Sequence, residues 1–238
     1  MLTQIYFNSV NSYILGVLNM KNGKMCKGIA ILISGFAQSK SDIDYFMTRL
    51  SARLVEANYG TLQIDLYGHG DSWGEFEEVT GERIIYNVSD AIKYIEKMFG
   101  EIPKFVIARG VYGNIIANSS LSSLYEVVCI NPTFNLNKFE REKYDKEIIL
   151  FNELFEHKKY EDLIVAMGGE IPNTRALKIS KIFVDDIFKS SINRCTDNVI
   201  VTFDENASIE EQAVCGFIRE SEWQNNLIDK VVDKVRRI

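Results

Sequence analysis

The segment Gly70-Asp-Ser-Trp-Gly74 has the G-x-S-x-G spacing that surrounds a nucleophilic serine in many enzymes. In enzymes that use this motif, the serine lies on a sharp turn between a strand and a helix, which exposes its hydroxyl as a nucleophile. Ser72 follows an expected strand over residues 61–66, but the next expected helix begins only at about Ile84. Because the tight strand-to-helix turn is missing, we expect that Ser72 is not a nucleophile.

A nucleophilic serine also needs a general base, and the chain contains only two histidines, His69 and His157. His69 lies in the same loop as Ser72, where we expect it to stabilise the loop. His157 lies in the charged segment 156–160, where we expect it to be solvated. Loss of triad residues lowers the rate of a serine hydrolase by roughly 10⁶-fold, so ordinary ester or amide hydrolysis is disfavoured.

The elements that position these residues alternate between strands and helices. Residues 3–9 and 12–19 predict an antiparallel hairpin with its turn at Val10-Asn11. Ser41 is the expected N-cap of the first helix, and residues 135–193 are a helix-rich stretch that we interpret as a cap. The further expected strands are 28–34, 61–66, 104–108, 126–130, 198–203 and 215–219, and the expected helices are 41–57, 84–99, 111–120, 208–214 and 222–237.

This order predicts an α/β fold with a mostly parallel sheet of about eight strands and helices on both faces. The core would comprise residues 1–134 and 194–238, and the helical cap of residues 135–193 would be inserted after the sixth strand. The aromatic residues of the cap, Phe183 among them, are expected to form the cap's own core.

Three segments resemble motifs of the α/β-hydrolase superfamily, in particular its small esterase, thioesterase and lipase-like members with a cap. They are residues 33–42, similar to the oxyanion loop, residues 65–72, similar to the loop after the fourth strand, and residues 106–113, similar to the nucleophile elbow. In the first segment, Ser34 replaces the usual histidine. The resemblance also implies that the backbone N–H groups of Phe36 and Val111 correspond to the oxyanion hole.

The resemblance places Gly110 at the nucleophile position, with Ala108 and Tyr112 at the flanking glycine positions. The acid position falls on Asn206, two residues after Asp204, and the histidine position falls near Glu222. All three triad positions are therefore substituted. Glycine tolerates the positive φ of the elbow, so the bend could persist without its nucleophile.

The other groups expected near the turn at Gly110 suggest that it binds a ligand. The candidate ligand-binding residues are Ser34, Phe36, Arg109, Gly110, Val111 and Asp204. A helix N-terminus near Val111 beside the guanidinium of Arg109 would suit a carboxylate or phosphate. In the alternative, Arg109 pairs with a protein carboxylate such as Asp204 or Glu222.

The sequence thus predicts a pseudoenzyme in an accessory or biosynthetic role, which binds a small ligand, acidic if Arg109 holds it, or a partner protein. One alternative is an esterase-type hydrolase or a lyase with unconventional residues, for which Ser34, Asp204, Glu222 and His69 are the candidates. Another is a structural subunit of a biosynthetic complex with a vestigial pocket.

Composition narrows the partners. The net charge of −6 is spread along the chain without a basic stripe, which makes nucleic acid an unfavoured partner. No apolar run is long enough to span a membrane, and we expect a cytoplasmic protein. The four cysteines lack C-x-x-C spacing and are expected to be free thiols, and no cluster of metal ligands is visible, so we expect no metal and no cofactor.

Overall fold

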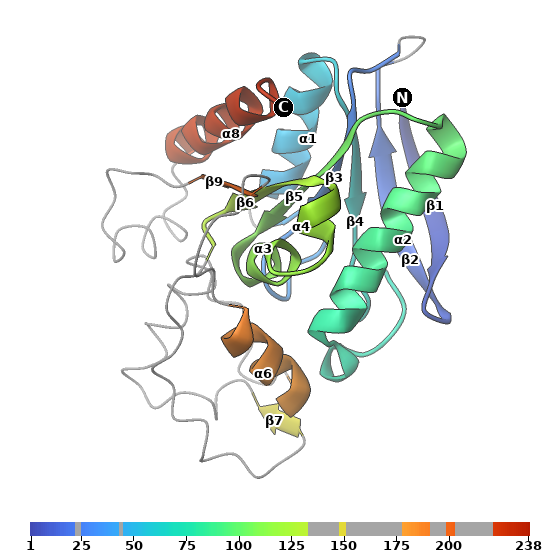
Figure 1. Ribbon diagram of the computed structural model, residues 1–238, viewed down its shortest axis with the longest axis vertical. Helices are drawn as coiled ribbons and strands as arrows, with labels where there is room; N and C mark the ends of the chain where they lie inside the picture. The colour runs from blue at the N-terminus through green and yellow to red at the C-terminus, as the bar shows by residue number, and fades with distance from the viewer. Residues whose placement is uncertain (22–24, 43–44, 133–147, 151–177, 191–198, 203–220) are drawn as a thin grey trace.

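The computed structural model describes residues 1–21, 25–42, 45–132, 148–150, 178–190, 199–202 and 221–238. Seven described strands form one mixed sheet in the order β1-β2-β4-β3-β5-β6-β9 (Figure 1). They are β1 (Leu2–Ser9), β2 (Ser12–Asn19), β3 (Ile29–Ile33), β4 (Gly60–Ile64), β5 (Lys104–Arg109), β6 (Glu126–Ile130) and β9 (Val199–Thr202). The strand expected at 215–219 and the helix expected at 208–214 lie outside the described residues.

The first two strands form the predicted hairpin. Strand β1 pairs antiparallel with β2 in an unbroken register from Leu2↔Asn19 to Ser9↔Ser12. Val10 and Asn11 form its two-residue turn, with φ values of 45° and 59°, as a tight hairpin requires. Strand β2 then pairs antiparallel with β4, whereas β4, β3, β5, β6 and β9 are parallel.

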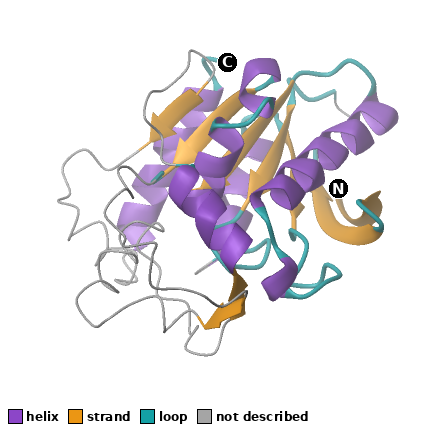
Figure 2. Cartoon of the chain, turned by 60° about the horizontal axis from the view of Figure 1, so that its bottom comes forward, coloured by secondary structure: helices purple, strands orange, loops and turns teal. Residues whose placement is uncertain are grey.

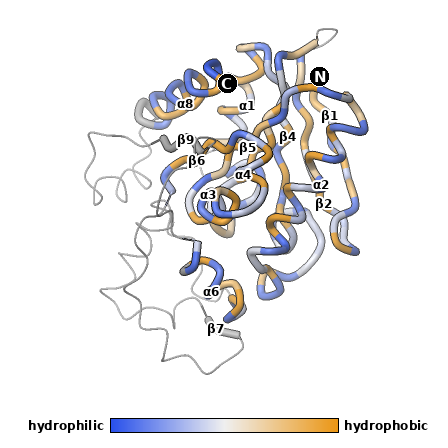
Figure 3. Tube along the Cα trace, viewed as in Figure 1, coloured by the Kyte–Doolittle hydropathy of each residue, from blue (hydrophilic) through white to orange (hydrophobic). Residues whose placement is uncertain are grey.

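Helices cover both faces of the sheet (Figure 2). They are α1 (Phe46–Glu56), α2 (Gly81–Phe99), α3 (Gly110–Ala117), α4 (Leu121–Leu124), α6 (Lys181–Lys189) and α8 (Ser221–Val235), with a short 3₁₀ helix, η2 (Phe76–Glu78). Helices α1 and α8 pack into one apolar cluster, and α2, α3 and α6 pack into a second cluster. The fully buried strand β3 contributes alternate side chains to the two clusters, which explains its continuous apolar sequence (Figure 3).

Two expected helix starts were wrong. The first helix begins at Phe46 and not at Ser41, because the backbone is left-handed at Asp42 and Tyr45, with φ values of 63° and 58°. The carbonyl of Ser41 accepts the N–H of Met47, and the N-cap residue of α1 is Tyr45, which makes no side-chain capping bond. The second helix begins at Gly81, where the hydroxyl of Thr80 accepts the N–H of Arg83 at 3.1 Å.

The described parts of residues 135–193 lie between β6 and β9 and outside the main sheet. Strands β7 (Ile148–Leu150) and β8 (Lys178–Ser180) pair antiparallel, and α6 follows directly. Phe183 of α6 belongs to the same apolar cluster as α2 and α3. The expectation that Phe183 packs in a separate cap core was therefore wrong, because its ring fills space against the main domain.

Candidate functional site

The turn between β5 and α3 retains the geometry of a nucleophile elbow. Arg109 is extended, with φ −105° and ψ 144°, and Gly110 then has a φ of 56° at the first residue of α3. A non-glycine residue would be strained there. Gly113 lets the helix approach the strand, since a Cβ atom would lie 3.0 Å from the carbonyl oxygen of Ala108. The bend is present, but the residue at its apex has no hydroxyl to expose.

Arg109, which precedes the elbow, forms a buried ion pair. Its Nη1 lies 3.1 Å from Oδ1 of Asp42, and the two side chains are 5% and 0% exposed. The guanidinium carbon also lies 5.1 Å from the ring centroid of Phe46. Asp42 comes from the loop after β3, and β3 is the parallel neighbour of β5, so the two loops meet at the same edge of the sheet.

This pairing adds a carboxylate to the sequence-based candidates for the partner of Arg109, and the side chains of those candidates are not described. The carboxylate in contact is Asp42, which was not among them. Asp204 and Asn206 lie outside the described residues, as does His157, and the side chain of Glu222 in α8 is likewise not described. The missed signal was topological: Asp42 closes the loop that follows β3, and adjacent parallel strands bring their carboxyl-end loops together.

The loop after β3 is held by hydrogen bonds to its own backbone and to the elbow helix. The hydroxyl of Ser34 donates to the carbonyl of Gln38 at 3.3 Å, and the N–H of Gly35 donates to Oδ2 of Asp42 at 3.4 Å. The N–H of Ala37 donates to the hydroxyl of Tyr112 at 3.3 Å. The expected ligand-binding residues Ser34, Phe36, Arg109, Gly110 and Val111 are all buried here.

His69 is directed at this same helix and is bonded at both ring nitrogens. Nδ1 lies 2.8 Å from the carbonyl oxygen of Tyr67, and Nε2 lies 2.5 Å from the hydroxyl of Tyr112. Burial lowers the pKa of His69 to about 4, although the carbonyl of Tyr67 opposes this, so the ring is neutral at pH 7.

The proton positions in this network follow from the chemistry of its members. A carbonyl can only accept, so Nδ1 of His69 carries the proton and Nε2 must accept from the hydroxyl of Tyr112. That hydroxyl oxygen in turn accepts the N–H of Ala37. The lone pair that would act as a general base is therefore occupied by Tyr112, which is fully buried. These contacts fit the structural role expected for His69.

Aromatic rings pack together beside the elbow. Phe36 stacks on Phe183 with ring centroids 6.1 Å apart and meets Phe76 edge to face at 5.5 Å. Tyr112 stacks on Phe183 at 6.2 Å, and His69 lies 4.9 Å from Phe76. The resemblance implied a ligand-binding role for Phe36 through its backbone N–H. The structure adds that its ring, 1% exposed, is part of the core.

Ser72 is fixed by two backbone contacts. Its hydroxyl donates to the carbonyl of Asp65 at 2.6 Å and accepts the N–H of Leu15 at 2.9 Å. The hydroxyl therefore joins the loop after β4 to the part of β2 that extends beyond the end of β4. This role agrees with the expectation that the G-x-S-x-G spacing at Ser72 does not mark a nucleophile.

The carboxylate of Asp65 organises the same loop. It is fully buried and accepts the Nζ of Lys40 at 2.8 Å and the N–H of Asp71 at 3.0 Å. Lys40 also bridges to the carboxylate of Asp71, and these two carboxylates raise the pKa of Lys40 against the opposing effect of its burial, which lowers it. A Cβ atom on Gly70, where φ is 50°, would lie 2.4 Å from this carboxylate, so only glycine fits.

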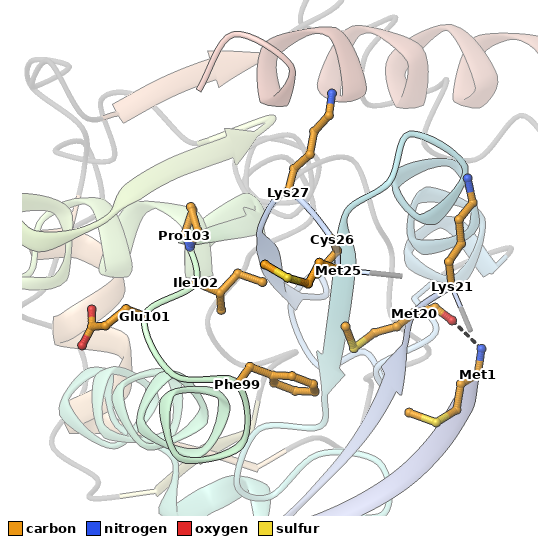
Figure 4. Close-up of a pocket in the computed structure, with 10 residues that line it drawn as sticks. All are labelled: Met1, Met20, Lys21, Met25, Cys26, Lys27, Phe99, Glu101, Ile102 and Pro103. Carbon is orange, nitrogen blue, oxygen red and sulfur yellow. Dashed lines mark hydrogen bonds between the residues drawn. The ribbon is translucent and has the colours of Figure 1, made fainter. Parts of the chain in front are cut away.

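A cavity of about 690 Å³ lies at the opposite end of the sheet, where β3 and β5 begin (Figure 4). Apolar and sulfur-bearing side chains line it, among them Met20, Met25, Cys26 and Phe99. Figure 4 shows that the amino groups of Lys21 and Lys27 point away from the sulfur atoms. Ligands of open α/β folds bind at the carboxyl ends of the strands, so this cavity is not related to the elbow.

In the described parts of the chain, no group of three or more His, Cys, Asp or Glu side chains is placed to hold a metal ion. Cys26 and Cys129 are free thiols. None of the helices described is both long and apolar enough to cross a bilayer.

Comparison by sequence gives no match to a protein-family model or to a curated protein. Comparison by structure gives many. Est1E from Butyrivibrio proteoclasticus, solved with bound ferulic acid, is 14% identical over 98% of both chains, with a TM-score of 0.68. DcsB, solved with a substrate analogue, is 12% identical over 100% of this chain and 99% of its own, with a TM-score of 0.63.

This chain has the α/β-hydrolase fold. A soluble variant of monoglyceride lipase from Saccharomyces cerevisiae also matches, at 16% identity over 80% of this chain and 68% of the lipase, with a TM-score of 0.56. At such identities the likeness concerns the fold alone. Within the α/β-hydrolase fold, the turn at Gly110 lies where the nucleophile elbow belongs, between a parallel strand and the helix that follows it.

Proposed function

We propose that this protein is a pseudoenzyme of the α/β-hydrolase fold, which acts in an accessory role by binding a small ligand or a partner protein. The observation that carries the proposal is Gly110. The elbow has the backbone shape that presents a nucleophile, with φ 56° at the critical residue, and it presents only a hydrogen atom.

Two further observations support a non-hydrolytic role. The imidazole of His69, although it is directed at the elbow helix, has its acceptor nitrogen bonded to Tyr112 at 2.5 Å and its other nitrogen bonded to the backbone. Ser34, in the segment 33–42, and Ser72, in the segment 65–72, both donate their hydroxyl to a carbonyl oxygen. A serine without a base remains a weak nucleophile at neutral pH.

The ion pair of Arg109 bears on the type of ligand. An acidic ligand that bound the Nη1 of Arg109 would have to displace Asp42 from a contact where both side chains are almost fully buried. Separating a buried pair costs several kcal/mol, which a small carboxylate would have to recover. The proposed ligand or partner is therefore expected to bind through groups other than the Nη1 of Arg109.

The experiment that tests the proposal combines covalent labelling with turnover. The purified protein is incubated with a fluorophosphonate probe and with a panel of short-chain aryl esters and thioesters, next to an active serine esterase of the same fold. We expect no labelling and no turnover above that of a Ser72→Ala variant. Stoichiometric labelling that disappears on changing one serine would contradict the proposal.

Binding is tested separately. A thermal-shift screen of esters, amides and small acids, together with a pull-down using the tagged protein, should reveal at least one ligand or partner. If labelling is absent and both binding screens are empty, the binding role fails and a purely structural role remains.

A further inference from the structure

Strand β1 is an open edge of the sheet. It pairs with β2 on one side, and no strand in the described parts of the chain pairs with it on the other (Figure 1). The edge of β2 is treated differently: beyond the end of β4, its Leu15 N–H is bonded by Ser72 and its Tyr13 carbonyl by the N–H of Trp73. The contrast singles out β1 as the edge that remains available for pairing.

The sequence of β1 carries none of the features that protect edge strands. Its eight residues, Leu-Thr-Gln-Ile-Tyr-Phe-Asn-Ser, include no charge, no proline and no glycine. The register with β2 is continuous, so no bulge turns the edge away. Leu2 and Tyr6 are 71% and 56% exposed. Long, uncharged and regular edges of this kind are templates for pairing with another strand.

The hydrogen-bond pattern between β1 and β2 shows which backbone groups of β1 point away from β2. Met1 and Met20 exchange backbone hydrogen bonds, and in an antiparallel ladder such pairs alternate with pairs that do not bond. The odd-numbered residues of β1 therefore bond to β2. The N–H and carbonyl groups of the even-numbered residues, Leu2, Gln4, Tyr6 and Asn8, point outward along the free edge.

We propose that β1 pairs antiparallel with β1 of a second copy of this chain, which joins the two sheets into one. The two-fold axis would pass by Ile5, so that Leu2 faces the partner's Asn8 and Gln4 faces the partner's Tyr6. In this register all four outward residues of each copy donate and accept, which gives eight hydrogen bonds across the interface.

The choice of a second copy rests on self-complementarity. A strand that faces its own copy meets its own charges, and β1 has none, so no like charges oppose each other. Within one chain the amide of Gln4 already donates to the hydroxyl of Tyr6 at 3.0 Å. Across the two-fold axis, the same two side chains are placed opposite each other and can form the same bond.

The test uses analytical ultracentrifugation of the full chain, with any tag at the C-terminus, from nanomolar to sub-millimolar concentration. We expect the wild type to be a dimer. The double variant Leu2→Lys/Asn8→Lys places like charges opposite each other at both ends of the interface and should be monomeric. The matched variant Leu2→Lys/Asn8→Glu places opposite charges there and should be dimeric.

Circular dichroism establishes that each variant is folded, and a Gln4→Pro variant, which removes only an outward N–H, should be monomeric while Gln4→Val stays dimeric. A monomeric wild type throughout the concentration range would overturn the proposal. So would a dimer that survives Leu2→Lys/Asn8→Lys, or one that is lost equally in both charge variants. None of these outcomes depends on whether the protein hydrolyses or binds a ligand.

Discussion

Replacing Asp42 with asparagine is expected to destabilise the protein by about 3 kcal/mol. Its carboxylate is fully buried and lies 3.1 Å from the guanidinium of Arg109, which is 5% exposed. Removing one partner of a buried pair costs about 3–5 kcal/mol, because the other charge remains buried without compensation. Asparagine keeps an oxygen acceptor and tolerates the φ of 63° at this position, which places the loss at the lower end of that range.

The assay is urea-induced unfolding followed by circular dichroism, for the wild type, Asp42→Asn, Arg109→Met and the double variant. Since the two residues interact directly, we expect the loss of unfolding free energy in the double variant to be smaller than the sum of the two single losses, by at least about 1 kcal/mol. A loss below about 1 kcal/mol for Asp42→Asn, or strict additivity, would refute the reasoning that this pair is buried and coupled.

Three more predictions concern Ser72, Gly110 and His69. Ser72→Ala should cost about 1–2 kcal/mol in urea unfolding, because the N–H of Leu15 loses its acceptor, and it should leave fluorophosphonate labelling at background; a labelling signal lost in this variant would contradict the structural role. Gly110→Ser should cost about 1–2 kcal/mol through left-handed strain and create no esterase activity, so measurable ester turnover in this variant would be the contrary result. Burial lowers the pKa of His69 from 6.5 to about 4, so on acidification the unfolded state binds a proton before the folded state does. The contribution of the neutral ring to stability is therefore complete above pH 6.5 and is lost as the pH falls to 4. The loss amounts to roughly 3 kcal/mol. His69→Gln should show a flatter dependence of the unfolding free energy on pH over this range, and an unchanged dependence would count against the buried neutral ring.

Much of the fold follows from local patterns in the sequence. The hairpin turn at Val10-Asn11 and the apolar runs of β3 to β6 were confirmed, because tight turns and strands buried on both faces leave strong local signals. The start of the first helix was wrong, because Ser41 is a good capping residue in a segment whose path is set by tertiary contacts. The chain turns through left-handed residues there so that Asp42 can reach Arg109.

The site was harder to predict than the fold, because its contacts join residues distant in sequence. The bend at Gly110 was predicted from the resemblance of residues 106–113 to a nucleophile elbow and from the tolerance of glycine for positive φ, and the φ of 56° agrees with it. The bond between His69 and Tyr112 joins residues 43 positions apart, and no local pattern records it. The Asp42 contact could have been found from topology, since the loops after adjacent parallel strands converge. The partner of Arg109 would then be sought among the carboxylates in loops that follow the strands next to β5 in the sheet.

Under the proposed non-hydrolytic function, the contacts around the elbow predict that a single substitution at Gly110 does not create a hydrolase. A serine at position 110 would regain the hydroxyl, but it would do so in a left-handed conformation from which glycine now relieves the strain. The nearest described imidazole, His69, would still be neutral, buried and bonded to Tyr112 through its acceptor nitrogen. Freeing that nitrogen requires removal of the Tyr112 hydroxyl, which would leave the N–H of Ala37 without the acceptor it now has. Freeing the acceptor nitrogen of His69 is therefore expected to lower the stability of the loop after β3, which the Ala37–Tyr112 bond now holds to α3.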